Sequence, residues 1–445
     1  MIAPGDSIAD IGRRLRARTL TSEALTDECL QRIEADDHRL NAFILVLADE
    51  ARRQAREADR ELAAGHDRGP LHGVPISIKD LIDAAGTPTT AASRVRAGHV
   101  ADRDAPVIAS LRQAGAVFVG KTNLHEFALG TTSEDSAFGP ARNPYDVTRS
   151  PGGSSGGAGI SVAAGMAVAA IGTDTGGSIR IPSAACGVVG LKPGYGEIST
   201  TGVVPLSETL DHVGPLTRNA ADARVIYRVL TGRPASTDPP IPIASLRLAV
   251  PRPYFLDLLD DEVRRRFEEA LERLRVAGAH VTDVVIPHTD AIAVTYLNIQ
   301  LTDAFAYHRS MLEQVPEQYT APVRQRLEMG RLISASDYRH ALNMRDVLRR
   351  DVSAVLEGHD ALMLPTLPIP APLIGAETVQ IGERNEPVRP IMLRLTQLFN
   401  LTGHPAIALP AGTTSAGLPC SLQLAGADAE SLLRVAVACE PHISV

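Results

Sequence analysis

Few cysteines and no long apolar run are present in this sequence, and both shortages exclude classes of protein. The cysteines lie far apart, with no Cys-x-x-Cys spacing among them: Cys29, Cys186, Cys420 and Cys439. Neither a disulfide framework nor a zinc site is therefore expected, and we predict no metal and no organic cofactor. The longest apolar run, residues 158–172, is too short to cross a bilayer and is rich in glycine and alanine.

The N-terminal segment lacks the apolar stretch of a secretory signal peptide, which predicts a cytoplasmic protein with no membrane partner. Basic residues are not in excess, because the net charge is −8 at pH 7 and the isoelectric point lies near 5.9. The arginines at 13–16 stand among acids, as on a solvated helix face. Nucleic acid is therefore not expected as a direct partner, whereas a homodimer is compatible with the sequence.

Apolar and helical stretches alternate along the first half of the chain. Residues 1–65 predict N-terminal helices, the first capped by Ser7 and the third running over residues 42–64. Beyond them come apolar runs separated by helical stretches: 73–82, 116–122 and 167–171. Short unbroken apolar strands between helices indicate a buried, largely parallel sheet, and so an α/β fold.

The second half continues this alternation and is interrupted once. Apolar strands are expected at several further places: 245–251, 280–287, 360–368, 405–412 and 420–426. Between them, residues 289–357 form a helical block that is long enough to fold over a cleft. Ser336 can cap a helix there whose apolar positions face the body of the protein: Leu342, Leu348, Val352 and Val355. The length of 445 residues alone suggests two or three domains.

Residues 115–122, "GAVFVGKT", fit the phosphate-binding pattern G-x-x-x-x-G-K-[ST]. The pattern requires a bent loop between its glycines, but Ala116, Val117, Phe118 and Val119 form a strand-like run instead. A strand cannot wrap its amides around a phosphate. We therefore interpret Gly115 as the end of a helix and Lys121 as the end of the strand, and we expect no nucleotide binding.

Residues 152–156, "GGSSG", fit the G-x-S-x-G pattern of the nucleophile elbow in α/β-hydrolases. An elbow follows directly on a strand, whereas residues 143–151, "NPYDVTRSP", are typical of a loop. The elbow interpretation is therefore disfavoured.

A second Gly/Ser turn, "GTDTGGSIR" at 172–180, follows "GGSSGG" at 152–157 after one small-residue helix and one strand. Both turns can lie close together at one edge of the sheet. The amides of residues 175–178 could then converge on one point and bind an oxyanion, with glycine supplying the unusual backbone angles. A flexible linker would not repeat its pattern after a buried unit.

A serine hydroxyl needs a base, and Lys79 stands at the end of an apolar strand. Burial there removes hydration from the ammonium, so its pKa falls and the amine can accept a proton. The alternative is that Lys79 pairs with Asp80 or Asp83 at the surface. The residues alone leave both possibilities open.

Three long motifs, "GVPISIKDLI", "SPGGSSGGAG" and "GTDTGGSIRIPSAACGVVGLKP", together resemble the amidase signature family. The likeness is strongest over a signature core at 71–215 and is compatible with the whole chain, residues 1–445. It implies one large α/β domain with a mixed, mostly parallel sheet wrapped by helices. It also implies hydrolysis of linear amides by a serine triad, in which Ser178 is the nucleophile, Ser154 relays protons after a cis peptide bond and Lys79 is the base.

The same resemblance implies roles for further residues. The oxyanion and substrate-binding positions are Thr175, Gly176, Gly177, Gly130 and Tyr296. The supporting residues around the turns are Ser155, Asp174 and Arg180. Arg324 or Arg326 lies near another substrate-contacting position, and we expect the block 289–357 and the loop 129–139 to select the substrate.

Another member of this family, the A subunit of a tRNA-dependent amidotransferase, is the alternative. In that subgroup an acid holds the amine of glutamine, whereas here residues 389–399 contain no acid and Leu393 occupies the matching place. The difference argues against glutamine and predicts acyl groups that are neutral and partly apolar, in amides, carbamates, ureas or esters. A pure binding protein on this fold is a third interpretation, which the intact triad residues disfavour.

Overall fold

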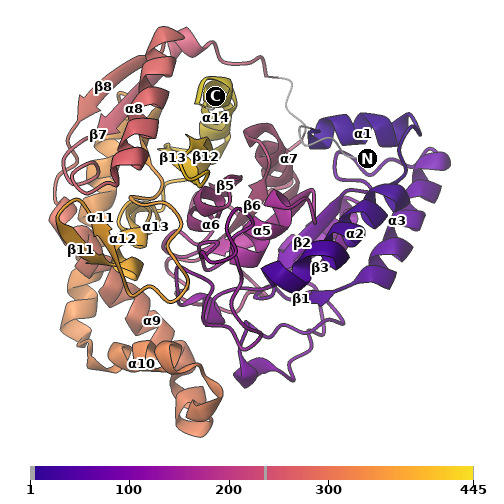
Figure 1. Ribbon diagram of the computed structural model, residues 1–445, viewed down its shortest axis with the longest axis horizontal. Coiled ribbons are helices and arrows are strands. Elements are labelled where there is room, and N and C mark those ends of the chain that lie inside the picture. Colours follow the sequence, from indigo (N-terminus) through magenta and orange to yellow (C-terminus); the bar gives the residue numbers. More distant parts are fainter. Residues whose placement is uncertain (1–5, 235–237, 444–445) are drawn as a thin grey trace.

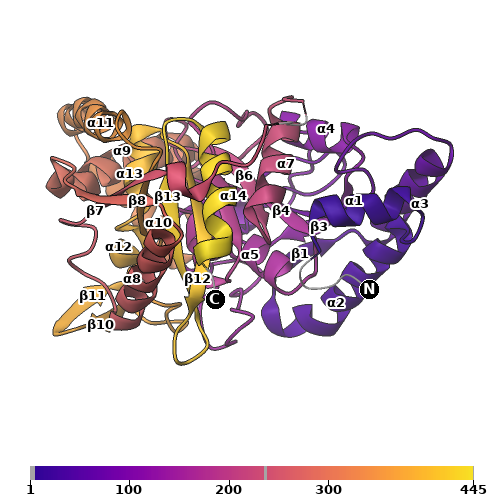
Figure 2. The same ribbon diagram turned by 90° about the horizontal axis from the view of Figure 1, so that it is seen from above.

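Eleven strands among residues 6–234 and 238–443, the part of the chain that the computed structural model describes, form one sheet. The sheet extends through the length of the molecule (Figures 1 and 2) in the order β1-β3-β2-β4-β6-β5-β12-β13-β9-β7-β8. The strands are β1 (Phe43–Val46), β2 (Pro75–Lys79), β3 (Val117–Thr122), β4 (Ala169–Asp174), β5 (Val189–Lys192), β6 (His212–Thr217), β7 (Arg247–Pro251), β8 (His280–Val284), β9 (Ala361–Pro365), β12 (Ala406–Thr413) and β13 (Pro419–Ala425). A separate hairpin pairs β10 (Thr378–Ile381) with β11 (Arg384–Pro387).

The prediction of one α/β domain with a mixed sheet is confirmed. Strands β3, β2 and β4 pair in parallel at one end, and β9, β7 and β8 pair in parallel at the other. The strands between these groups pair antiparallel, a feature that the alternation of strands and helices did not indicate. The reason is that β5 connects to β6, and β12 to β13, without a crossover helix.

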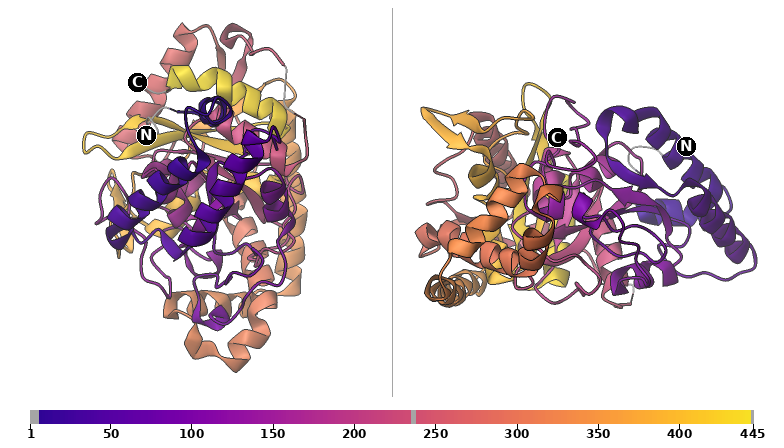
Figure 3. Two further views of the ribbon diagram at one scale, coloured as in Figure 1. Left: turned by 90° about the vertical axis from the view of Figure 1, so that its right-hand side faces the viewer. Right: turned by 90° about the horizontal axis from the view of Figure 1, so that it is seen from below.

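The helices surround this sheet: α1 (Ile8–Arg16), α2 (Ser22–Leu40), α3 (Ala48–Ala63), α4 (Pro106–Gln113), α5 (Gly156–Ala163), α6 (Arg180–Ala185), α7 (Ala220–Leu230), α8 (Asp261–Val276), α9 (Ile292–Gln314), α10 (Ala321–Met329), α11 (Ala335–Leu356), α12 (Val388–Leu393), α13 (Gln397–Thr402) and α14 (Ala429–Ile443). The block α9 to α11 lies at the opposite end of the molecule from α1 to α3 (Figure 3). Helix α14 contacts both α7 and α8, while α5 and α6 contact each other and the middle strands.

Two local predictions were wrong. The third helix does not begin at residue 42, because residues 43–46 are the strand β1 and pair with β3. The backbone of Asn41 is left-handed, which ends α2, and the apolar run that follows it favours a strand. The cap of α11 is Ser334, whose hydroxyl accepts from the Asp337 amide, so Ser336 lies inside the first turn.

The apolar face predicted for helix α11 is confirmed, because Leu348 and Val352 are buried and Leu342 and Val355 pack against the core.

Lys121 is the penultimate residue of strand β3 and is fully buried, with its Nζ 3.0 Å from Asp80 Oδ1. The Nζ also donates to the carbonyl of Pro88 at 2.8 Å. The residues between the two glycines of the phosphate-binding pattern are thus strand, as predicted, and the lysine of the pattern is engaged in the protein interior. Lys121 and Asp80 form a structural ion pair.

We expect Asp80→Ala to lower the free energy of unfolding by about 3–5 kcal/mol, because it leaves the Lys121 charge buried and unpaired. Urea denaturation measures this change. Glu50→Ala, which breaks the exposed pair of Glu50 with Arg53, is the control and should cost at most about 1 kcal/mol. Equal effects of the two variants on the free energy of unfolding would contradict the structural role of the Lys121–Asp80 pair. Because the pattern at residues 115–122 forms no phosphate-binding loop, addition of ATP should leave the unfolding midpoint of the wild type unchanged.

Candidate active site

The two Gly/Ser turns and Lys79 meet at one edge of the sheet. Strands β2 and β4 pair in parallel, so Lys79 at the end of β2 and the loop after β4 emerge side by side. The amide of Ser155 donates to the carbonyl of Ser178 at 3.2 Å, and its hydroxyl donates to the carbonyl of Thr173 at 3.1 Å. The predicted proximity of the two turns is therefore confirmed.

Lys79 is completely buried, and its Nζ has two hydroxyl partners. It donates to Ser154 Oγ at 2.8 Å and to Thr173 Oγ1 at 2.7 Å. No carboxylate lies within ion-pair distance among the described residues, so the alternative of a surface pair with Asp80 or Asp83 is wrong. Burial lowers the pKa of Lys79 to about 7, although the charges of Asp174 and Asp211 raise it. A substantial fraction of Lys79 is therefore neutral near pH 7.

Ser154 follows a cis peptide bond, Gly153–Ser154, as the family resemblance implied. Its carbonyl accepts from the amide of His125 at 3.1 Å and from Ser133 Oγ at 3.2 Å. The backbone passes so close to the next loop that a Cβ on Gly153 would lie 2.8 Å from the amide nitrogen of Thr132. Only glycine fits at residue 153.

The loop 175–178 presents amides without partners. Over the described ranges, the amides of Gly176, Gly177 and Ser178 donate to no other protein group. Gly177 has a φ of +145°, a backbone angle that L side chains rarely adopt. Ser178 is 6% exposed, whereas Lys79 and Ser154 are 0% exposed. Of the two serine hydroxyls, that of Ser178 is therefore the more accessible to a substrate.

An ion pair between Asp174 and Arg180 supports this loop. Both are fully buried, with Arg180 Nη2 3.0 Å from Asp174 Oδ1. Burial alone would raise the pKa of Asp174, but the guanidinium holds it well below its usual range. Asp174 Oδ2 accepts from the amide of Ile179 at 3.1 Å, just after Ser178. The remaining donors of Arg180 go to distant groups: the Thr396 carbonyl, Asn400 Oδ1 and Gln423 Oε1.

Several residues around the site were not found from the sequence. Thr173 shares Lys79 Nζ with Ser154, and Asp211 accepts from Thr175 Oγ1 at 2.5 Å. Thr396 Oγ1 donates to the Gly176 carbonyl at 2.6 Å, and Asn400 Nδ2 donates to the Asp174 carbonyl at 3.0 Å. Only Thr173 carried a local signal, since it lies inside the motif "GTDTGGS"; the others are distant in the sequence.

A cavity of about 310 Å³ lies beside residues 130–132, of which Thr132 packs against Gly153. Lys79, Ser154 and Ser178 are not among the residues that line the cavity. Its lining comes from the loop 129–139, from helix α10 and from the segment 376–389: His125, Leu129, Gly130, Thr131, Thr132, Glu134, Asp135, Pro322, Val323, Arg326, Ala376, Glu377, Val388 and Arg389. The loop 129–139 and the helical block, which we expect to select the substrate, therefore line one cavity. Arg326 lines the cavity, whereas Arg324 on the same helix is exposed.

Tyr296 lies between the loop 175–178 and the two arginines of the cavity, Arg326 and Arg389. A Cβ on Gly176 would lie 2.2 Å from Tyr296 Oη and 3.0 Å from Leu393 Cδ2, so both side chains pack on the loop. Burial raises the pKa of Tyr296, although the charge of Arg389 lowers it. Tyr296 is therefore a neutral phenol beside the unpartnered amides. Leu393, which occupies the place of the acid that holds the amine of glutamine in the amidotransferase subunits, packs on the same loop.

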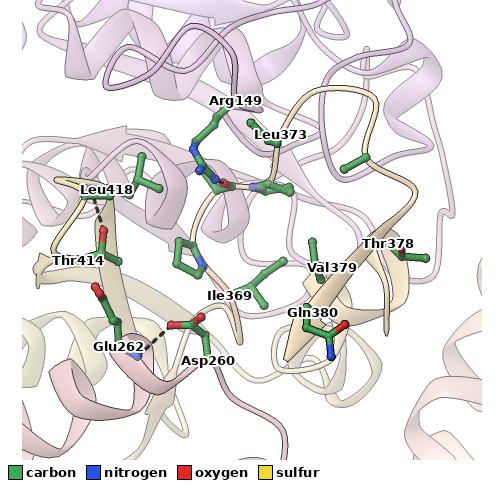
Figure 4. Close-up of a pocket in the computed structure, with 15 residues that line it drawn as sticks. Arg149, Asp260, Glu262, Ile369, Leu373, Thr378, Val379, Gln380, Thr414 and Leu418 are labelled. Atoms are coloured by element: carbon green, nitrogen blue, oxygen red, sulfur yellow. Dashed lines mark hydrogen bonds between the residues drawn. The ribbon is translucent and has the colours of Figure 1, made fainter. Parts of the chain in front are cut away.

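A second hollow, of about 410 Å³, lies between α8, the β12–β13 hairpin and the segment 369–380 (Figure 4). It contains none of the predicted site residues. The two carboxylates that line it accept hydrogen bonds from nearby amides, since Asp260 caps α8 and Glu262 accepts from the amide of Ser415. The side chain of Arg149 donates to the Ala371 carbonyl. This hollow offers no nucleophile paired with a base.

Within residues 6–234 and 238–443, no group of three or more histidine, cysteine, aspartate or glutamate residues is arranged to hold a metal ion. In the same part of the chain, no helix is both long and apolar enough to span a bilayer.

Comparison with known proteins agrees with this geometry. The family model Amidase matches residues 24–431. The chain is 39% identical to an amidase of Pseudomonas putida, over 98% of this chain and 95% of that protein. It is 36% identical to the A subunit of the glutamyl-tRNA(Gln) amidotransferase of Geobacter metallireducens, over 98% and 96% of the two chains. A crystal structure of an amidase superposes with a TM-score of 0.92 and 37% identity, over 98% of this chain and 99% of that chain.

The fold and these relatives define a hydrolase of amide C–N bonds. The chain belongs to the amidase signature family, which confirms the resemblance found in the sequence, and it is an amidohydrolase.

Proposed function

We propose that this protein hydrolyses linear amides through an acyl-enzyme on Ser178, with Ser154 as the proton relay and Lys79 as the base. The observation that carries the proposal is the 2.8 Å hydrogen bond from a buried lysine without a carboxylate partner to Ser154 Oγ. A lysine that is partly neutral near pH 7 can accept a proton, and an ordinary surface lysine cannot.

In the first half of the reaction, neutral Lys79 takes the proton of Ser154 as Ser154 takes that of Ser178. Ser178 Oγ then attacks the amide carbonyl, and the oxyanion lies against the loop 175–178. A well-placed donor there stabilises the transition state by about 3–4 kcal/mol. Ser154 passes a proton to the leaving nitrogen, the C–N bond breaks, and an ester to Ser178 remains.

In the second half, water attacks the ester and gives its proton to the relay, which frees the acid and restores Ser178. The unpartnered amides and the exposure of Ser178 support its role as the nucleophile. Asp174, Arg180 and Ser155 fix the two turns, and Gly130 and Tyr296 line the substrate side. The reaction consumes one amide and one water and releases an acid and an amine, with Ser178, Ser154 and Lys79 restored. We place this reaction in the cytoplasm.

Ser178→Ala should lower turnover to less than about a thousandth of the wild-type rate, because it removes the attacking oxygen. Amide hydrolysis by purified protein measures this, and labelling by a serine-reactive probe should be lost in parallel. Ser431→Ala, on the exposed face of α14, is the control and should behave as wild type. A Ser178→Ala variant that keeps more than about a thousandth of the rate would refute the assignment.

The pH profile of kcat/KM should rise through a pKa near 7 and level off above it. The sign follows from the mechanism: the base must be neutral, and Lys79 is neutral above its lowered pKa of about 7. Lys79→Met should lose most of the activity at every pH. If Lys79→Met kept both the rate and the limb near pH 7, Lys79 would not be the base.

The cavity bears on the choice of substrate. Arg326 makes no hydrogen bond or ion pair within the described residues, and Arg389 makes one hydrogen bond, to the Leu129 carbonyl at 2.6 Å. Burial and the charge of Arg326 lower the pKa of Arg389 to about 9. Two arginines without carboxylate partners favour an acyl group that carries a carboxylate, contrary to the neutral group that the sequence predicted.

That observation favours a second candidate function, glutamine hydrolysis as in the A subunit of a tRNA-dependent amidotransferase. Leu393 opposes it, because an apolar side chain cannot hold the amine of glutamine. Ammonia release from glutamine that depends on a copurifying partner would support this candidate, whereas hydrolysis of simple amides by the isolated chain supports the first.

Arg326→Ala and Arg389→Ala should each lower kcat/KM for carboxylate-bearing amides about tenfold more than for neutral amides of the same size, because each removes one unpaired positive charge. Tyr296→Ala should slow both substrates. Arg324→Ala removes the same charge from the exposed side of α10 and is the matched control. If the ratio of the two kcat/KM values were unchanged in Arg326→Ala and Arg389→Ala, these arginines would not select the acyl group.

A further inference from the structure

Asp211 joins the nucleophile loop to a second segment of the chain. Its side chain is buried just before strand β6, and its Oδ1 accepts from Thr175 Oγ1 at 2.5 Å. Its Oδ2 accepts from the amides of Leu206 and Ser207 at 2.9 and 3.1 Å. The carboxylate therefore has three donors, of which one belongs to the loop that ends at Ser178.

The second segment is itself tied to the helical block. Ser207 Oγ and Thr209 Oγ1 donate to Asp303 Oδ2 on α9 at 2.6 and 2.9 Å. Tyr338 on α11 donates to Asp303 Oδ1 at 2.8 Å. A continuous set of hydrogen bonds thus leads from α9 and α11 through Asp211 to Thr175.

Thr175 is the first residue of a loop that continues with two glycines, and such a loop has little stiffness of its own. The amide of Ile179 is anchored at the far end by Asp174, and the Gly176 carbonyl is anchored by Thr396. At the near end the Thr175 side chain has Asp211 as its partner. An ionised carboxylate makes a stronger hydrogen bond to a hydroxyl than a neutral group does.

We propose that Asp211 is a positioning residue for amide hydrolysis. Its ionised carboxylate fixes Thr175 and so holds the amides of residues 176–178 in the arrangement that stabilises the oxyanion. This inference rests on the proposed function of that loop and adds a residue that does not touch the substrate.

The charge state of Asp211 follows from its surroundings. Burial raises its pKa to about 6, although its three hydrogen bonds and Lys79 lower it. The titratable groups that interact with its charge are Lys79 at the end of β2 and Tyr296 on α9. Below its pKa the protonated carboxyl loses one acceptor, so the loop loosens as the pH falls.

The test compares Asp211→Asn, Thr175→Val and the double variant by steady-state kinetics on a simple amide at pH 8. We expect each single variant to lower kcat about 10- to 100-fold with KM within about twofold, as for loss of a hydrogen bond to a charged group. The double variant should be no slower than the slower single one, because both remove the same link. Thr175→Ser keeps the hydroxyl that Asp211 binds, so its kcat should be about tenfold or more above that of Thr175→Val.

Asp222→Asn is the matched control. Asp222 is also a buried carboxylate, its pKa is also raised to about 6, and it accepts from the amide of Ile8 at the start of α1. This variant should lose stability and keep kcat. Between about pH 5 and 6, log kcat/KM should fall with a slope approaching 2 in the wild type and near 1 in Asp211→Asn, because protonation of Asp211 adds its own 10- to 100-fold loss to that from protonation of Lys79.

Additive losses in the double variant would overturn the inference, since Asp211 would then act apart from Thr175. A profile of Asp211→Asn that shifts along the pH axis at an unchanged plateau would overturn it too, because Asp211 would then act only through the charge of Lys79. If Asp211→Asn does not fold, the comparison of Thr175→Val with Thr175→Ser remains. A Thr175→Val variant with the same kcat as Thr175→Ser would overturn the inference. Failure of the proposed function is a separate result, namely an active Ser178→Ala variant.

Discussion

Burial of one lysine without a carboxylate partner is the constraint on which the site depends. Lys79 ends strand β2 among hydroxyl groups, so its pKa falls to about 7. Lys121, at the end of the neighbouring strand β3, is equally buried but has Asp80 as a partner. Two buried lysines on adjacent strands thus have different surroundings, because one has a carboxylate within reach and the other has two hydroxyls.

The geometry of the sheet brings the remaining parts to this lysine. The parallel pairing of β2 and β4 places the loop 175–178 beside Lys79, and close packing at Gly153 brings the first turn against it. The loop is then held from outside by groups that are far apart in the sequence. Thr396, for example, lies 220 residues beyond Gly176, whose carbonyl it binds. Preorganised amides of this kind keep their orientation during the reaction and therefore stabilise developing charge.

Local patterns were sufficient where backbone and burial follow from neighbouring residues. The strands at 75–79, 117–122 and 169–174 were evident from their apolar runs, and the two Gly/Ser turns from their composition. The same reasoning missed β1, because four apolar residues between two helices are too few to distinguish a strand from a helix. It also missed the antiparallel middle of the sheet, since pairing direction depends on the path of the connections.

The sequence by itself determined the family and the fold class, and it supplied Lys79, Ser154 and Ser178 as the proposed triad, because these residues lie in long motifs whose spacing is local. Only the tertiary structure decided that Asp80 pairs with Lys121 rather than with Lys79, that Asp211 binds Thr175, and that Arg326 and Arg389 share a cavity without carboxylate partners. The physical reason is that the charge state of a buried group depends on which groups surround it in space, and those groups come from distant parts of the chain.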